Sequence, residues 1–305
     1  MWKKASYWCA TALAALSLGS VYAQEVRTLD TVKGQVELKG QPERVVVLDE
    51  GALDVALSAG VTPVATLAIR GGTGIADYLQ DYVEQPIEIV GTVREPNLES
   101  IFKLRPDLIL APATLPDTLY KKLVRIAPTV VPPENNVYED WTKTARLYAQ
   151  ALDKEAELDT QLEQLDTQFD ELKSKWQQPY TVSVVRWNPQ GPILMSGQLF
   201  TGQLLKKAGL QTLELADSFT SRPHSDTLSL ENLIQVDADW LLLASINADG
   251  KKALEDTQKQ PAFKQLKAVQ NDKVQIVDGQ IWSSSYGPLA AKVILNDLEK
   301  LAQQQ

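Results

Sequence analysis

Cysteine and histidine are nearly absent from this sequence: Cys9 and His224 are the only residues of their kinds among 305. A lone cysteine excludes a disulfide within the chain, and a lone histidine excludes a zinc or manganese site built from several imidazoles. Beyond the amino-terminal region, no stretch approaches the roughly 20 apolar residues that a membrane-spanning helix needs. We therefore expect a protein that is neither stapled by disulfides nor embedded in a membrane.

Basic residues are fewer than acidic ones, 30 against 39, which gives a formal net charge of -9. Proteins that bind nucleic acid use basic surfaces to neutralise phosphates. Nucleic acid is therefore not an expected partner, and the acidity favours solubility.

The first 23 residues have the pattern of a secretory signal peptide. Lys3 and Lys4 precede an apolar centre, and small residues lead to a cleavage site after Ala23. Cys9 lies inside this segment and lacks the small-residue run that precedes a lipidated cysteine. We predict a soluble, monomeric exported protein, located in the periplasm, with secretion to the medium as the alternative.

Two similar runs occur in the chain, EPNLESIFKLRPDLILAP at 95–112 and LSLENLIQVDADWLLLA at 228–244. Each begins with the spacing of a short amphipathic helix and ends in an apolar run typical of a buried parallel strand. Strands and helices alternate along the rest of the chain as well. We predict an α/β fold of two similar lobes with mainly parallel sheets, one at 24–138 and one at 178–305.

The segment at 139–177 separates the two predicted lobes. Residues 139–176 contain neither glycine nor proline, and their apolar residues recur at helical spacing, which favours one long helix or two abutting ones. A single helix of this length would measure about 57 Å, more than one compact lobe needs. We interpret the segment as a single long helix that bridges the lobes.

Several ordered motifs resemble the periplasmic substrate-binding proteins for ferric siderophores, a family that also includes vitamin B12 and haem binders. They include PERVVVLDEGALDVALSAGV at 42–61, VGTVREPNLESIFKLRPDLILA at 90–111 and VQIVDGQIWSSSYGPLAA at 274–291, together with the run at 228–244. The resemblance covers nearly the whole chain after the signal peptide. It implies two α/β lobes joined by one long helix, with the ligand in a shallow cleft between them.

The resemblance further implies capture without a chemical step, followed by delivery to an ATP-driven importer. In this family the chelator supplies the ligands of the iron, so the protein needs no cofactor and no metal site of its own. A ferric chelate offers oxygen atoms, often negative charge, and some apolar surface. Arginine side chains and aromatic faces suit these features.

Candidate ligand-binding residues are the arginines and aromatics in loops at the carboxyl ends of predicted strands, where doubly wound sheets bind ligands. The family commonly uses an arginine in the VG-to-EPNLE turn and an aromatic pair near the WSSSYG motif. Val93 stands where close relatives carry that arginine, with Arg94 beside it. The candidates are Arg70, Arg94, Arg186, Trp187, Arg222, Trp282 and Tyr286.

Glu99 and Glu231 occupy equivalent places in the two similar runs. In the family that the chain resembles, one glutamate from each lobe docks onto arginines of a two-subunit inner-membrane permease, so we expect these two to do so. The alternative is that each is only a first-turn glutamate, favourable at a helix amino terminus.

Other functions remain open from the sequence. Cobalamin or haem binding is an alternative within the same family, although haem iron usually needs an axial ligand and tyrosines are the abundant choice here. A periplasmic hydrolase is an alternative of another class and would have to use His224, which lacks a recognisable serine context.

Overall fold

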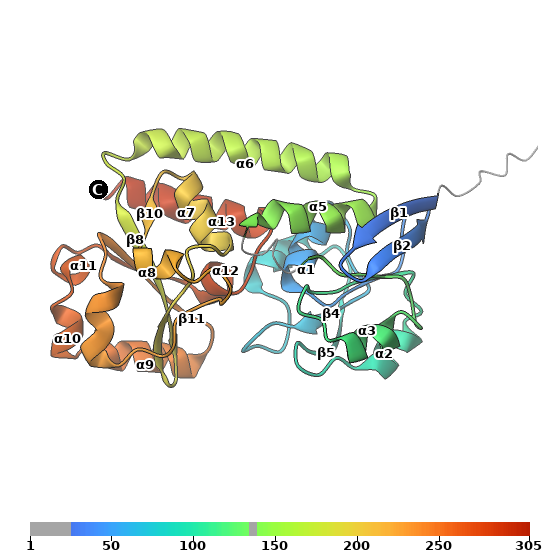
Figure 1. Cartoon of the computed structure of the whole chain (residues 1–305), viewed down its shortest axis with the longest axis horizontal. Helices are drawn as coiled ribbons and strands as arrows, with labels where there is room; N and C mark the ends of the chain where they lie inside the picture. Colours follow the sequence, from blue (N-terminus) through green and yellow to red (C-terminus); the bar gives the residue numbers. More distant parts are fainter. Residues whose placement is uncertain (1–25, 134–138) are drawn as a thin grey trace, which may run out of the picture.

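The chain forms two α/β lobes side by side beneath a long helix (Figure 1). The computed structural model describes residues 26–133 and 139–305, so the predicted signal peptide at 1–23 lies outside the described residues. Each lobe contains a mainly parallel sheet, and the predicted fold class is confirmed. In the described part of the chain, no helix combines the length and apolar character required to cross a bilayer.

The amino-terminal lobe begins with an antiparallel hairpin and continues into a parallel sheet. Hairpin strands β1 (Val26–Thr31) and β2 (Gly34–Lys39) pair throughout their length. The sheet has the order β5-β4-β3-β6-β7, so the first strand, β3, is central and buried on both faces. Its strands are β3 (Val45–Val47), β4 (Ala65–Ala68), β5 (Glu88–Thr92), β6 (Leu108–Leu110) and β7 (Thr129–Val130). The helices are α1 (Glu50–Ser58), η1 (Asp77–Tyr82), α2 (Leu98–Lys103) and α3 (Asp117–Leu123).

The carboxyl-terminal lobe follows a similar plan, with four parallel strands and one antiparallel strand. Its parallel strands follow the order β10-β8-β11-β12, and β9 pairs antiparallel with β8. The strands are β8 (Thr181–Asn188), β9 (Gly191–Leu194), β10 (Gln211–Thr212), β11 (Trp240–Ser245) and β12 (Val274–Asp278). The helices are α7 (Phe200–Lys207), α8 (Glu214–Asp217), η2 (Leu230–Val236), α9 (Ala248–Thr257), α10 (Pro261–Lys264), α11 (Lys267–Gln270), α12 (Gly279–Ser283) and α13 (Pro288–Ala302).

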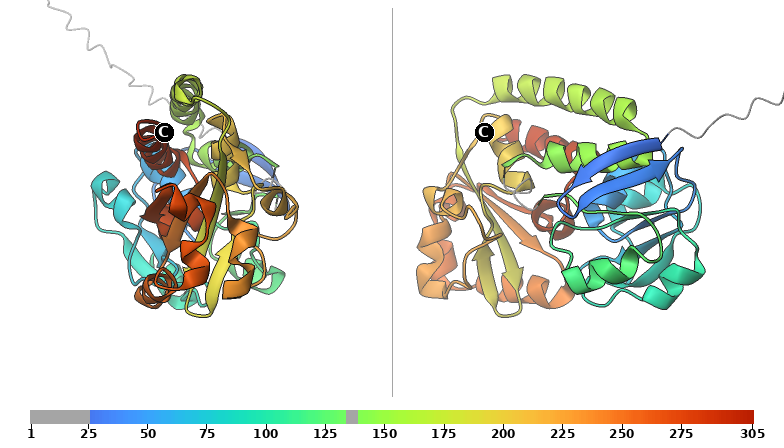
Figure 2. Two further views of the ribbon diagram at one scale, coloured as in Figure 1. Left: turned by 90° about the vertical axis from the view of Figure 1, so that its left-hand side faces the viewer. Right: turned by 45° about the vertical axis from the view of Figure 1, so that its right-hand side comes forward.

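The bridge consists of two abutting helices and not of the single helix that we predicted. α5 (Trp141–Leu152) ends at Asp153, which has a left-handed backbone (φ 60°), and α6 (Glu155–Lys175) then runs above both lobes (Figures 1 and 2). The Asp153 N–H donates to the carbonyls of Ala149 and Gln150, which closes the helix. Aspartate tolerates this conformation better than most residues, so the break needs no glycine.

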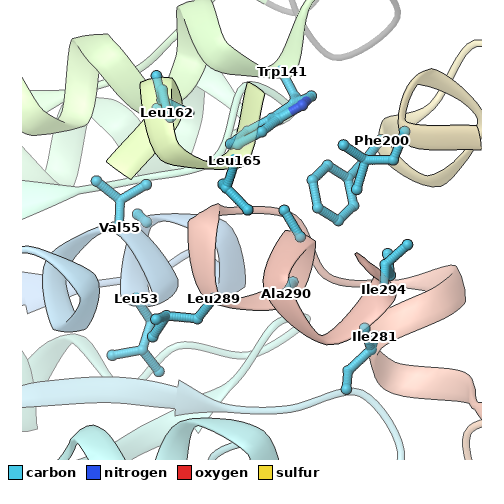
Figure 3. Packing of buried hydrophobic residues seen from close by; sticks show 14 of the residues in the cluster. Leu53, Val55, Trp141, Leu162, Leu165, Phe200, Ile281, Leu289, Ala290 and Ile294 are labelled. Carbon is cyan, nitrogen blue, oxygen red and sulfur yellow. The ribbon is translucent and has the colours of Figure 1, made fainter. Parts of the chain in front are cut away.

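One hydrophobic core runs through both lobes and the bridge. Figure 3 shows Leu53 of α1 and Leu289 of α13 packed together, although these helices belong to different lobes. Leu165 of α6 and Trp141 of α5 belong to the same cluster and lie on the bridge side of these two helices. Opening the lobes widely would expose this shared apolar surface to water, so the fold opposes a wide separation of the lobes.

Each of the two similar runs contains an aspartate that accepts hydrogen bonds from the start of the first parallel strand of its lobe. The Asp107 carboxylate, just before β6, accepts hydrogen bonds from the backbone N–H groups of Glu43 and Arg44, at 2.8 and 2.9 Å. The Asp239 carboxylate, just before β11, accepts from the backbone N–H of Thr181 at 2.9 Å. In each lobe the aspartate therefore fixes the entry of the first strand, and the strand that follows the aspartate pairs with that first strand.

Replacing Asp107 with alanine should lower the free energy of unfolding by about 1–2 kcal/mol, because two backbone donors lose a charged acceptor. Urea denaturation at neutral pH measures the effect. Glu84→Ala is the control, because Glu84 is exposed and makes no hydrogen bond among the described residues. Equal unfolding midpoints for the two variants would contradict the assigned role of Asp107.

Candidate functional site

A cleft of about 450 Å³ lies between the two lobes, a size typical of small-molecule sites. Its walls come from loops at the carboxyl ends of the parallel strands, where ligand sites of such sheets form. The amino-terminal lobe contributes Leu48, Asp49, Glu50, Leu53, Thr66, Leu67, Ile69, Arg70, Ala76, Tyr78, Leu79, Val93, Pro112, Ala113, Thr114 and Pro132. The carboxyl-terminal lobe contributes Arg186, Met195, Leu199, Ser221, Pro223, His224, Ser283, Ser284, Ser285 and Tyr286.

Three of the seven predicted ligand-binding residues line this cleft: Arg70, Arg186 and Tyr286. Arg70 follows β4, Arg186 lies near the end of β8, and Tyr286 follows α12. The structure thus brings together residues that are more than 200 positions apart in the sequence, and places a cation on each side of the cleft.

Arg186 differs from the other charged residues of the cleft because its guanidinium is buried and has no ion-pair partner among the described residues. Its residue is 9% exposed, and no carboxylate among the described residues forms an ion pair with it. Its guanidinium donates a hydrogen bond to the Ser283 carbonyl at 3.3 Å, and its Nε has no partner in the part of the chain that the structure describes. Burial lowers the pKa of Arg186, and the charge of Arg70 lowers it further. A buried cation without a counter-charge is costly, so this group is suited to an anion supplied by a ligand.

Arg70 carries the second positive charge and lies on the surface of the opposite wall. Its backbone N–H donates to the Glu50 carboxylate at 3.1 Å. Burial raises the pKa of Glu50, and this hydrogen bond from Arg70 opposes the rise. The amino-terminal wall therefore presents charges of both signs, whereas the opposing wall presents Arg186.

Tyr286 joins the two lobes directly. Its hydroxyl donates to the Asp49 carboxylate, which also caps α1 by accepting from the Ala52 N–H at 2.9 Å. Burial raises the pKa of Asp49, and the hydrogen bond from Tyr286 opposes the rise. The ring lies against Gly51, where an added Cβ would come within 2.1 Å of it. Tyr286 thus lines the cleft and also holds the lobes together.

Trp187 and Trp282 do not line this cleft. Trp187 follows Arg186 in β8, and side chains alternate across a sheet, so its indole enters the core on the opposite face, against Phe263. Trp282 is fully buried, and its indole N–H donates to Asp297 of α13 at 3.1 Å. It borders a separate cavity of about 90 Å³ beside the cleft, together with Trp141 and Phe200.

Arg94 and Arg222 are exposed and lie outside the cleft lining. Val93 takes the lining position beside Arg94, as the departure from the family pattern suggested. Arg222 stacks over Phe219, with its guanidinium carbon 4.3 Å from the ring centroid, and pairs with Asp226 at 3.5 Å. Both arginines are therefore placed as surface charges.

Several lining residues were not among the sequence candidates. Asp49 and Glu50 come just after β3, separated from it only by Leu48, so the same strand-end criterion that selected Arg70 could have found them. His224 also lines the cleft, beside Met195, with which its backbone forms an isolated antiparallel β-bridge. Ser283, Ser284 and Ser285 also line the cleft, and they lie inside the WSSSYG motif, between the two aromatic candidates. Within residues 26–133 and 139–305, no three His, Cys, Asp or Glu side chains are grouped to hold a metal ion.

Glu99 and Glu231 are not in this lining, and each lies at the second position of a short helix, α2 and η2. The Glu99 side chain is 77% exposed and pairs with Lys103 at 2.7 Å. Both glutamates are available at the surface.

Comparisons with known proteins agree with this architecture. The model of the family described as "Periplasmic binding protein" matches residues 45–281. The putative ABC transporter substrate-binding lipoprotein YhfQ of Bacillus subtilis is 30% identical, over 95% of this chain and 93% of that protein. The Fe(3+) dicitrate-binding periplasmic protein FecB of Escherichia coli is 27% identical, over 91% of both chains.

Solved structures resemble this fold closely. The crystal structure of Staphylococcus aureus SirA complexed with staphyloferrin B superposes with a TM-score of 0.78 at 27% identity, over 91% of this chain and 98% of that one. The predicted two-lobe fold and family are therefore confirmed, and relatives of this kind act outside the cytoplasm. The chain belongs to the periplasmic binding protein family, whose members bind substrates and are not enzymes.

Proposed function

We propose that this protein captures an anionic ferric chelate in the interlobe cleft and delivers it to an ABC importer of the inner membrane. The observation that carries the proposal is Arg186, a buried cation in the cleft that forms no ion pair with any carboxylate of the described residues. Carboxylate or catecholate oxygens of a chelate would supply that counter-charge. Relatives named as binders of ferric dicitrate and of staphyloferrin B support the ligand class.

Capture in this scheme is binding without chemistry. The chelator occupies the coordination positions of iron, and Arg186 and Arg70 would contact its outer oxygens from opposite walls. Because the lobes share one hydrophobic core, closure around the ligand would be small. The periplasm is the proposed compartment, with Glu99 and Glu231 as the residues that dock the loaded protein onto the permease.

Fluorescence titration of the purified protein without residues 1–23 tests the ligand class. Trp141 and Trp282 border the cavity beside the cleft, so a bound ferric complex should quench their emission. The panel consists of ferric citrate, a ferric hydroxamate, a ferric catecholate, haemin and cobalamin. We expect saturable quenching by a ferric chelate of net negative charge, and at least tenfold weaker binding of the same chelator without iron.

The iron-free chelators and a free tryptophan solution serve as controls for inner-filter effects. Saturable binding of cobalamin or haemin alone would replace the ferric-chelate proposal with the corresponding alternative. Binding of none of the five would contradict capture of iron complexes.

A further inference from the structure

Two large apolar side chains stand out on the surface at equivalent places in the two lobes. Phe102 is 65% exposed and Ile234 is 66% exposed. Aligning the two similar runs on their Leu-Glu pairs places Phe102 opposite Ile234. Their preceding neighbours also match, because Ile101 and Leu233 are both buried in their lobes. The same burial pattern thus occurs twice, and in both copies it leaves an apolar side chain in water.

Each exposed apolar residue accompanies one of the two glutamates. Phe102 lies three residues after Glu99 in α2, and Ile234 lies three residues after Glu231 in η2. Residues three apart share one face of a helical turn. Glu99 pairs with Lys103, but an exposed pair of this kind is weak and leaves the carboxylate free to change partners. The repeated feature is therefore an acidic group beside an apolar one.

Both copies lie on the side of the molecule away from the bridge. In Figures 1 and 2, α6 runs along the top, and α2 lies at the bottom of the amino-terminal lobe. η2 packs against α10, which lies low in the other lobe. One partner could therefore contact both copies at once.

We propose that Phe102 and Ile234 are the apolar anchors of the docking surface, and that each enters an apolar pocket in one of two like subunits of the membrane permease. The inference rests on the proposed docking role of Glu99 and Glu231 and extends it to two further residues. Exposed aromatic and large aliphatic side chains are typical anchors of interfaces, and the charged rim beside them steers association.

The duplicated pattern and its charge favour this partner over a second copy of the chain. A permease with two like subunits presents the same surface twice, which suits one acidic and apolar pair in each lobe. Two copies of this protein would instead bring glutamates and a net charge of -9 against each other. The fitting partner therefore carries cations beside its apolar pockets.

Iron uptake by the source bacterium tests the proposal. A strain lacking the gene receives wild-type protein, Phe102→Ala/Ile234→Ala, Glu99→Lys/Glu231→Lys or the control Ile276→Ala. Ile276 is 61% exposed on β12, outside both similar runs. The probe is ⁵⁵Fe equilibrated with spent medium from iron-starved cultures, and the initial rate of accumulation is measured. Gel filtration of each purified protein after incubation with the same medium measures retained ⁵⁵Fe and oligomeric state.

We expect the apolar double variant to transport at least tenfold more slowly than the wild type, while it remains monomeric and retains ⁵⁵Fe within twofold of the wild type. Ile276→Ala should transport normally. Normal transport by the apolar variant, with transport lost in the glutamate variant, would overturn the anchor role and leave glutamate docking intact. Normal transport by both variants would overturn docking at this surface altogether. Failure of the wild-type protein to restore uptake would instead contradict the proposed function.

Discussion

Replacing Arg186 with methionine is expected to weaken binding of the ferric chelate about 100-fold, while leaving the free protein at least as stable as the wild type. The loss corresponds to about 3 kcal/mol, within the range for removing one partner of a desolvated charge pair. Fluorescence titration with the chelate that binds the wild-type protein measures the affinity, and urea denaturation measures the stability.

The opposite signs of the two effects have one physical cause. In the free protein, Arg186 is buried, and within residues 26–133 and 139–305 it has no carboxylate partner and its Nε makes no hydrogen bond. Its desolvation is a cost that only the bound anion offsets. Methionine fills similar space and has no charge to desolvate. The free variant therefore avoids the desolvation cost of the guanidinium, whereas its complex lacks the electrostatic attraction between the guanidinium and the anionic ligand.

Arg222→Met is the matched control, because Arg222 is half-exposed, pairs with Asp226 and does not line the cleft. Its effect on affinity should be less than threefold. Arg70→Met should lie between the two, with about a tenfold loss, because Arg70 lines the cleft but is exposed to water. A larger loss in Arg222→Met than in Arg186→Met would place the ligand elsewhere.

The second large effect is expected at Asp54, a fully buried carboxylate on α1. It accepts hydrogen bonds from the backbone N–H groups of Leu289 and Ala290, at 2.9 and 2.8 Å, and from the Tyr78 hydroxyl at 3.0 Å. The two amides belong to the first turn of α13, where an acceptor is needed. Asp54→Ala should therefore lower the free energy of unfolding by about 3 kcal/mol, since it leaves three buried donors unpaired.

The contribution of Asp54 should also depend on pH. Burial raises the pKa of Asp54 to about 7 from 3.8, although its three hydrogen bonds oppose the rise. Between pH 4 and 7 the folded state therefore binds more protons than the unfolded chain at this group. Stability from this group is then fully present below about pH 4 and is lost as the pH rises through 7.

Urea denaturation at pH 5, 6, 7 and 8 measures this dependence. Asp54→Asn should flatten the decline, and the part that remains should come from Asp49 and Glu50, whose pKa values burial also raises. Asp81→Asn is the control, because Asp81 is exposed, and it should retain the full decline. An unchanged slope in Asp54→Asn would show that Asp54 is ionised throughout this range.

The Asp54 contact also bears on how the protein works. It ties α1 of one lobe to α13 of the other, and Tyr286 makes a second tie through Asp49. Together with the shared core in Figure 3, these contacts oppose separation of the lobes. A preformed cleft of this kind binds without a large cost of rearrangement.

The sequence by itself determined the two-lobe plan, because hydrophobic periodicity reports which face of each element is buried. The similar runs at 95–112 and 228–244 predicted a duplicated unit, and the structure adds that Asp107 and Asp239 anchor the first strand of each lobe. Strand ends gave the candidate ligand-binding residues, and two of these candidates, Arg70 and Arg186, line the cleft. These inferences depend on local pattern, which the sequence carries directly.

Only the tertiary structure decided which candidates face the cleft and what holds the lobes together. Arg186 and Trp187 are adjacent in sequence, yet the pleat of β8 sends their side chains to opposite faces of the sheet. The bridge breaks at Asp153 without the glycine or proline that would have marked the break. In the sequence, Asp54 is indistinguishable from an ordinary helical aspartate. Its role depends on the hydrogen bond from the Leu289 N–H of α13, 235 residues away. Contacts between distant segments depend on how the elements pack, and local hydrophobic periodicity does not predict that packing.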